Sequence, residues 1–213
     1  MVQATNPAHG EHVGGEGRRG RGASGSRSRP RLSAQDWADA ALTAIGEGGL
    51  AAVAVEPLAA RLGTTKGSFY WHFANREALI EAALARWEQT NTEAIITAVD
   101  RQEGPERRLR HLFAEVTRAA EEDPLEVALL ATAAHPQVAP VLRRVTDRRI
   151  AYVAQLFTDL GYQPRAARDR ALLAYTSYLG HTQLSHAVPE SLPREVDHSS
   201  YVDWVVETLL RPS

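Results

Sequence analysis

The sequence contains no cysteine, which excludes disulfide bonds and any zinc or iron–sulfur site held by thiolates. It also lacks an apolar run of about 18 residues, the length that a membrane-spanning helix requires. The N-terminal stretch has no apolar core of the kind found in signal peptides. We therefore expect a soluble, cytoplasmic protein.

Motifs of enzymes and metal proteins are missing as well. The chain has no G-x-S-x-G, P-loop or G-x-G-x-x-G motif, so an enzyme has no positive support. His181 and His186 are too widely spaced to share a helix face as the two histidines of H-E-x-x-H do. We expect no catalytic site, no cofactor and no metal site.

Charge gives no overall sign of nucleic-acid binding. The formal net charge of the 213 residues is -2, and Lys66 is the single lysine. From Arg31 to Glu77, acidic residues outnumber basic ones. This balance argues against binding by charge alone, but it is compatible with a site-specific reader that uses a few placed donors.

Residues 1–30 are rich in Gly, Ser and Arg and contain almost no apolar side chain. Such a segment cannot offset the entropy of ordering, and we expect a disordered tail. Its arginines outnumber its glutamates, which gives it a net positive charge. The tail is either a solvated extension without a role, or an arm whose arginines enter the minor groove or follow phosphates.

Hydrophobic spacing after the tail predicts helices, and no strand pattern appears. Ser33 and Asp36 form a capping box at the start of the first helix. Asn75 starts a long helix that we expect to run to about Val99. Further helices are predicted over residues 105–121, 123–134, 141–160, 165–186 and 199–210. The predicted fold class is all-α.

The stretch Ala59–Phe73, AARLGTTKGSFYWHF, has the pattern of two short helices joined by a tight turn. The first helix, Glu56–Leu62, runs into Gly63, which can adopt the left-handed conformation that ends a helix. Thr64 or Thr65 then caps the second helix. The apolar side chains expected to hold the two helices together are Leu58, Leu62, Phe69 and Phe73. This helix-turn-helix pattern predicts a second helix that lies in the major groove of DNA.

The run LAARLG-TT-KGSFYWHF-ANREALI resembles the DNA-binding segment of the TetR family of bacterial transcriptional repressors, roughly over Leu32 to Leu84. The resemblance implies a three-helix DNA-binding domain over residues 31–91, with its helix-turn-helix motif at about 54–73. Residues 92–213 would form a larger helical domain for ligand binding and dimerisation. Ala54 departs from the pattern, because the family usually has a Ser or Thr there that caps the helix and contacts a phosphate.

Lys66 is the residue expected to read a base, since its ammonium can reach O6 and N7 of guanine. Gly67 would let the helix approach DNA closely, and Ser68 could donate to a base edge or a phosphate. By resemblance, Tyr70 and His72 would hold phosphates, and Trp71 would pack partly against the neighbouring helix. The complete predicted DNA-binding set is Thr64, Thr65, Lys66, Gly67, Ser68, Tyr70, Trp71, His72, Asn75 and Arg76.

Asn75 would cap the next helix, whose free N–H groups and Arg76 would point at the DNA backbone. The alternative to DNA binding is a three-helix motif that serves protein contacts only.

The second half offers two kinds of candidate site. A ligand pocket needs concave apolar walls with a few polar groups, although each candidate alone is more readily explained as a core or interface residue. The ligand-binding candidates are Trp87, Phe113, Thr132, His135, Tyr152, Tyr175, Tyr178 and His181. Helix 165–186 is apolar on more than one side, so it and the last helix are predicted to form a four-helix dimer interface, unless one face packs only within the subunit. The interface candidates are Leu179, Gly180, Leu184 and Trp204.

The sequence therefore predicts a homodimeric repressor that binds a palindromic DNA operator and is released by a small-molecule effector. One alternative keeps DNA binding without an inducer, as a constitutive regulator or an activator. The other is a helical protein-interaction module whose motif no longer binds DNA. No residue identifies the effector, the operator or the target genes.

Overall fold

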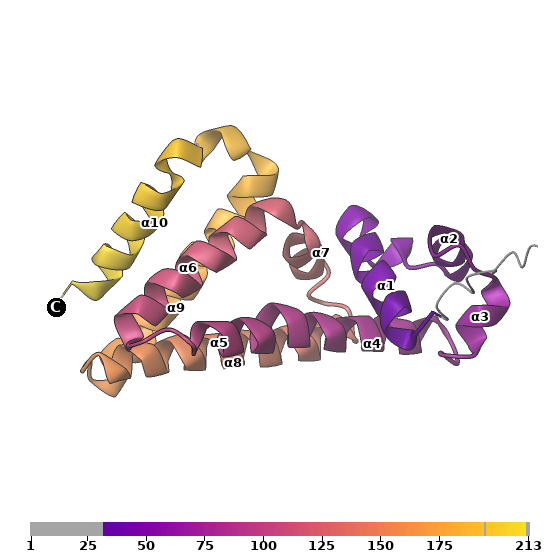
Figure 1. The fold of residues 1–213 in the computed structure, drawn as a ribbon, viewed down its shortest axis with the longest axis horizontal. Helices are drawn as coiled ribbons and strands as arrows, with labels where there is room; N and C mark the ends of the chain where they lie inside the picture. Colours follow the sequence, from indigo (N-terminus) through magenta and orange to yellow (C-terminus); the bar gives the residue numbers. More distant parts are fainter. Residues whose placement is uncertain (1–31, 194, 212–213) are drawn as a thin grey trace, which may run out of the picture. The chain divides into compact units, whose positions relative to one another are not determined.

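The computed structural model describes residues 32–193 and 195–211. The predicted disordered tail, residues 1–30, lies outside the described residues, so both interpretations of its arginines remain predictions. Leu32–Ser213 form one compact unit. Every regular element in the described part of the chain is helical, which confirms the predicted fold class (Figure 1).

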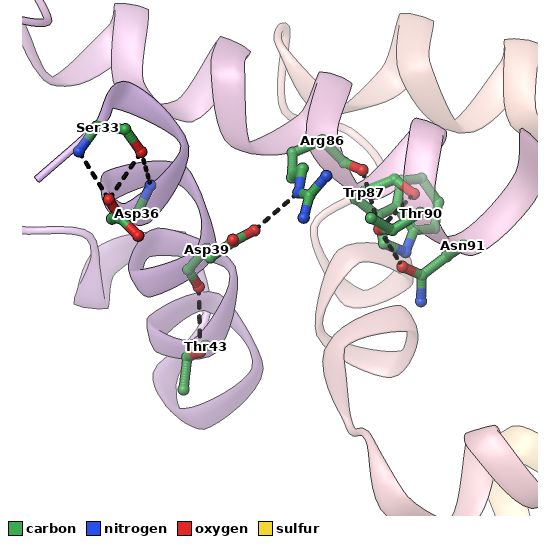
Figure 2. A network of polar contacts seen from close by, with 8 residues as sticks. All are labelled: Ser33, Asp36, Asp39, Thr43, Arg86, Trp87, Thr90 and Asn91. Atoms are coloured by element: carbon green, nitrogen blue, oxygen red, sulfur yellow. Dashed lines mark hydrogen bonds and ion pairs between the residues drawn. The ribbon is translucent and has the colours of Figure 1, made fainter. Parts of the chain in front are cut away.

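Helix α1 (Ala34–Gly48) begins with the predicted capping box (Figure 2). The backbone N–H of Asp36 donates to Ser33 Oγ at 3.2 Å, and the backbone N–H of Ser33 donates to Asp36 Oδ2 at 2.7 Å. The hydrogen bond from the Ser33 backbone is the main reason that the pKa of Asp36 is lowered. Gly49, with φ of 68°, ends the helix, and the 3-10 turn η1 (Leu50–Ala52) follows.

The turn between α2 (Val55–Arg61) and α3 (Lys66–Tyr70) has the predicted left-handed glycine. Gly63 has φ of 64°. Its N–H donates to the carbonyl of Ala60 at 3.1 Å, and the N–H of Thr64 donates to the carbonyl of Ala59 at 2.9 Å. This pair of bonds is a Schellman motif, which satisfies the last carbonyls of α2 and turns the chain into α3.

The long helix predicted from Asn75 to Val99 has an internal change of pitch. It consists of α4 (Arg76–Glu88), a π-helical turn η2 (Gln89–Glu93) and α5 (Ala94–Val99). Asn75 caps α4 as predicted, since its Oδ1 accepts from the backbone N–H of Ala78 at 2.8 Å. Within the polar run before α5, the Thr90 hydroxyl donates to the carbonyl of Arg86 at 2.9 Å, and such a bond competes with regular helix (Figure 2).

Five helices complete the fold, in the order α6 (Pro105–Glu122), α7 (Leu125–Ala131), α8 (Val138–Asp159), α9 (Pro164–Ala187) and α10 (Glu195–Leu210), with a short 3-10 turn η3 (Pro189–Ser191) before the last. Three boundaries differ from the prediction by at least three residues. Helix α7 ends at Ala131 rather than Ala134, because the chain tightens into i→i+3 bonds at Thr132 and Ala133. Helix α8 begins before Pro140, which lies in the first turn where a missing N–H is harmless. Helix α10 begins at Glu195 rather than Ser199.

The buried apolar side chains form two clusters. The first contains residues from α1, α2, α3 and α4, from α7 and from the beginning of α8. It includes Trp37, Trp87, Leu129 and Val145. The second joins α5, α6, α9 and α10 with the end of α8. The core of the N-terminal helices is thus completed by residues far beyond the predicted boundary at residue 91. That boundary falls in η2, and the division into two domains remains a prediction.

Polar contacts reinforce the packing of the first cluster. Arg86 of α4 donates from Nε to Asp39 Oδ1 of α1 at 2.9 Å (Figure 2).

Gly46 of α1 lies against the start of α7, where an added Cβ would be 3.6 Å from the backbone of Leu125. Helix α7 therefore packs closely on α1.

Leu129→Ala should lower the free energy of unfolding by about 2–5 kcal/mol, because Leu129 is fully buried in the first cluster. Chemical denaturation monitored by circular dichroism measures this change. Leu130→Ala, on the same helix but only half-buried, is the matched control and should cost clearly less. An equal loss in both variants would contradict the role of α7 in this core.

Candidate functional site

Helix α3 presents a polar face outward and an apolar face inward. Phe69 is fully buried and meets the Trp37 ring edge-on, with ring centroids 5.4 Å apart. Lys66, Gly67 and Tyr70 are exposed on the outer side. The structure therefore orients α3 as a recognition helix requires, with its anchor residue in the core and its polar residues accessible.

The remaining residues of the predicted DNA-binding set lie around this face. Thr65 is exposed at the N-cap position of α3 but makes no capping bond with its side chain. Thr64, Ser68 and His72 are half-buried. An added Cβ on Gly67 would meet only Thr65 Oγ1, at 3.6 Å, so the missing side chain leaves the outer surface of the helix open.

Lys66 is paired with an acidic residue of the preceding helix. Its Nζ lies 2.9 Å from Glu56 Oε1, and both side chains are more than half exposed. The hydrogen bond between them is the main reason that the pKa of Glu56 is lowered and the pKa of Lys66 is raised. In the absence of DNA, the predicted base-reading ammonium is thus held by the protein itself.

Arg76 and Trp71 are placed differently from the prediction. Arg76 donates from Nε to the carbonyl of Val53 at 2.6 Å and from Nη2 to the carbonyl of Leu50. Its guanidinium therefore ties α4 to the segment before α2, instead of pointing freely at the DNA backbone. The Trp71 side chain is 81% exposed, so the expected packing against the neighbouring helix is wrong.

A cavity of about 120 Å³ lies between η2, α5, α6, α8 and α9. Phe113, Tyr152, Tyr175 and Tyr178 from the predicted ligand-binding set line it, together with aliphatic side chains of α5 and α6. His181 instead lines a much smaller hollow beside it. The structure thus brings four of the predicted residues to one concave apolar site.

The other three predicted ligand-binding residues lie outside the lining of this cavity. Trp87 is buried in the first cluster. Thr132 donates back to the carbonyls of Ala128 and Leu129 at 3.1 Å, and Nδ1 of His135 accepts from the backbone N–H of Gln137 at 3.3 Å. Thr132 and His135 therefore serve the local structure between α7 and α8.

One end of the cavity is polar and centred on Arg149 of α8. Its Nη1 donates to Glu126 Oε1 at 2.7 Å, its Nε to Thr92 Oγ1 at 3.0 Å and its Nη2 to the carbonyl of Asn91 at 3.0 Å. The second carboxylate oxygen of Glu126 accepts from the Tyr178 hydroxyl at 2.7 Å. We call these five residues the Arg149 cluster.

Burial determines the electrostatics of the Arg149 cluster. Burial disfavours the charge on Arg149, but the Glu126 carboxylate more than offsets this, so the pKa of Arg149 is raised. Burial, followed by the same carboxylate, raises the pKa of Tyr178, which therefore remains a hydrogen-bond donor. The Arg149 guanidinium also lies 5.4 Å from the ring centroid of Trp87 and 5.9 Å from that of Tyr178.

Sequence reasoning did not identify Arg149 or Glu126, although a signal for them exists. On α8 the buried side chains Val145, Tyr152 and Val153 define the inner face, and Arg149 falls between them at helical spacing. Glu126 is next to the buried Leu125. A charged residue at an inward position indicates a buried pair, but a sequence without contacts does not show which residue is its partner.

Helices α9 and α10 leave an apolar surface uncovered. Leu172, Leu173, Leu184 and Trp204 are between 41% and 58% exposed. Leu179 is half-buried, and an added Cβ on Gly180 would meet nothing within 4 Å. Leu184 and Trp204 of the predicted dimer interface therefore lie open to a partner, and dimerisation itself remains a prediction.

The described residues contain neither a membrane-spanning helix nor a cluster of metal-ligating side chains. Across residues 32–193 and 195–211, no helix is both long enough and apolar enough to span a membrane. Among these residues, no group of three or more His, Asp or Glu side chains is placed so that it could hold a metal ion.

The buried anchor and exposed outer face of α3, together with the Schellman turn before it, define a helix-turn-helix DNA-binding domain at the start of an all-α chain. Residues 38–83 match the model of a family described as bacterial regulatory proteins, tetR family. Residues 38–83 are thus a DNA-binding segment of the TetR type.

Solved structures share this fold. A transcriptional regulator from Rhodococcus sp. Rha1 is 22% identical with a TM-score of 0.67, over 84% of this chain and 96% of its own. A TetR transcriptional regulator from Legionella pneumophila is 13% identical with a TM-score of 0.66, over 84% and 95%. The regulator FadR from Bacillus subtilis, in complex with stearoyl-CoA, is 16% identical with a TM-score of 0.61, over 84% and 98%. None of the curated proteins matches the chain.

Arg76→Ala should lower the free energy of unfolding by about 1–3 kcal/mol, because it leaves two backbone carbonyls without their donor. Thermal or urea denaturation measures the change. Arg107→Ala, which removes an exposed arginine of α6, is the control and should have little effect. If Arg76→Ala weakened DNA binding without lowering stability, a direct contact with DNA would be indicated instead.

Proposed function

We propose that this protein is a homodimeric repressor that binds a palindromic operator through α3 and is released when a small molecule enters the cavity beside η2. The observation that carries the proposal is the outward polar face of α3, with Lys66, Gly67 and Tyr70 accessible above the buried Phe69. A helix held in this way can enter the major groove of DNA.

Binding to DNA would exchange the partner of Lys66. Its ammonium would leave Glu56 for a base edge or a phosphate, and the Glu56 carboxylate would then lie near the DNA backbone. Exposed ion pairs are weak, so this exchange costs little. The carboxylate would nevertheless repel phosphates, which would limit binding to DNA that lacks the correct sequence.

Dimerisation is supported by the uncovered apolar side chains of α9 and α10. Leu173 and Leu184 lie on the same side of α9, about three turns apart, and Leu172 of the same helix and Trp204 of α10 are exposed as well. Exposed apolar groups of this size mark interaction surfaces in soluble proteins. Two copies would present two α3 helices to two half-sites of one operator.

Contacts at the Arg149 cluster support release by an effector. Arg149 bonds η2, which continues α4 of the DNA-binding segment, and Glu126 of α7, which packs on α1. Two further arginines of α8 form ion pairs with the continuous helix made of α4, η2 and α5. Arg144 pairs with Glu88 at 2.6 Å, and Arg148 pairs with Glu93 at 3.0 Å. A ligand that rearranged this cluster would favour a different position of α4 and α7 relative to α8.

The stearoyl-CoA complex of FadR is consistent with a small-molecule effector, because that regulator has a similar fold. A regulator without an inducer is the main alternative, and the mostly apolar cavity beside η2 argues against it.

The first test is binding of the purified protein to the DNA directly upstream of its own gene, at two salt concentrations and against competitor DNA. Lys66→Ala should weaken specific binding roughly tenfold or more and relax the base preference at one position in each half-site. Fluorescence anisotropy with a set of single-base operator variants measures both effects.

Glu56→Gln is the matched variant for this experiment, since it removes the partner of Lys66 and leaves the lysine in place. It should strengthen binding to operator and competitor alike by roughly several-fold at low salt, because one carboxylate no longer repels phosphates. Equally weak, salt-dependent binding by the wild type and Lys66→Ala would argue against α3 as a reader of this DNA.

Leu173→Glu should convert the dimer to a monomer and abolish cooperative operator binding, because it places a charge in an apolar interface. Analytical ultracentrifugation gives the oligomeric state. Ala114→Glu introduces the same charge at an exposed position of α6 and should remain dimeric. A wild-type monomer, or a dimeric Leu173→Glu, would overturn this part of the proposal.

A further inference from the structure

The lining of the cavity beside η2 is mostly apolar but has a net negative charge. Its walls include Ile95, Ile96, Leu112 and Phe113, which would enclose a hydrocarbon or aromatic group. The charged residues of the lining are Asp123, Glu126 and Arg149, with a formal sum of -1. The cavity thus has one more carboxylate than it has guanidinium groups.

The positive charge of Arg149 is already taken up by the protein. Its hydrogen bonds go to the Glu126 carboxylate, the Thr92 hydroxyl and the Asn91 carbonyl. An anionic ligand that took over the hydrogen bond from Nη1 of Arg149 would displace Glu126. That would leave a buried carboxylate without its cation, and an unpaired buried charge is strongly unfavourable.

Glu126, in contrast, has an oxygen that a cation could use. Oε1 accepts from the charged guanidinium of Arg149, whereas Oε2 accepts from the neutral hydroxyl of Tyr178. An ammonium group could take the place of that hydroxyl and add charge to the bond. Tyr175 and Tyr178 lie beside each other with ring centroids 6.1 Å apart, and aromatic faces attract cations.

Asp123 adds a second carboxylate to the same lining. It is exposed, and its Oδ1 accepts from the backbone N–H of Leu125 at 2.9 Å. At this position it would attract an approaching cation and repel an anion. From these contacts we infer that the cavity binds a largely apolar organic cation, with its apolar body against α5 and α6 and its charged group at Glu126.

This inference deepens the proposed effector role and rests on it for its biological meaning, but binding can be tested separately. Three probes share one apolar body and differ in charge: phenylbutylamine, phenylbutanol and phenylbutanoate. Their affinities for the full chain are measured by ligand-detected NMR at neutral pH, where the amine is protonated. The amine should bind roughly tenfold more tightly than the carboxylate, with the alcohol between them.

Three variants locate the effect. Val116→Trp fills the cavity from α6 and should abolish binding of all three probes. Glu126→Gln should remove most of the preference for the amine. Because that change also leaves Arg149 without its carboxylate, Asp123→Asn provides a second test at an exposed position and should reduce the preference in part.

The outcomes separate this inference from the proposed function. Tighter binding of phenylbutanoate, equal binding of the three probes, or no binding of any of them would overturn the assignment of a cationic ligand. Binding of the amine that depends on Glu126 but leaves the operator complex intact would support the assignment and contradict release by an effector. Release of operator DNA by phenylbutanoate alone would support release and overturn the cationic assignment.

Discussion

The buried guanidinium of Arg149 connects parts of the chain that otherwise belong to different hydrophobic clusters. Arg149 lies on α8, and its guanidinium donates to Thr92 and Asn91 in the π-helical turn after α4. It also forms an ion pair with Glu126 of α7. Removing one member of a buried ion pair typically costs about 3–5 kcal/mol, so these three segments cannot separate independently. The cavity lies at this junction, and its occupant would contact all three.

The π-helical turn is what makes the junction possible. A π-helical turn relaxes the regular i→i-4 pattern, and such turns are frequent at functional sites. Here the turn lies between α4 and α5, and Arg149 of α8 donates to its Thr92 hydroxyl and its Asn91 carbonyl.

Local sequence signals predicted the N-terminal part of the molecule well. Ser33, Gly63 and Asn75 each act through neighbours a few positions away, and each has the predicted capping or turn geometry. The errors arose where a side chain found a distant partner. Arg76 bonds carbonyls more than twenty positions away, and Arg149 meets Glu126 across a similar separation. Helical periodicity indicates which face is buried, but it does not identify such pairs.

Lys66 has a chemical consequence beyond base recognition. Because it is the single lysine of the chain, the primary amine of the exposed α3 face is also the only side-chain amine in the sequence. Acetylation, or any other reaction directed at a lysine side chain, would therefore be confined to the exposed face of α3. All other Lys or Arg positions are occupied by arginine. The exposed face of α3 is therefore the one part of the protein where a lysine-modifying enzyme could remove a positive charge.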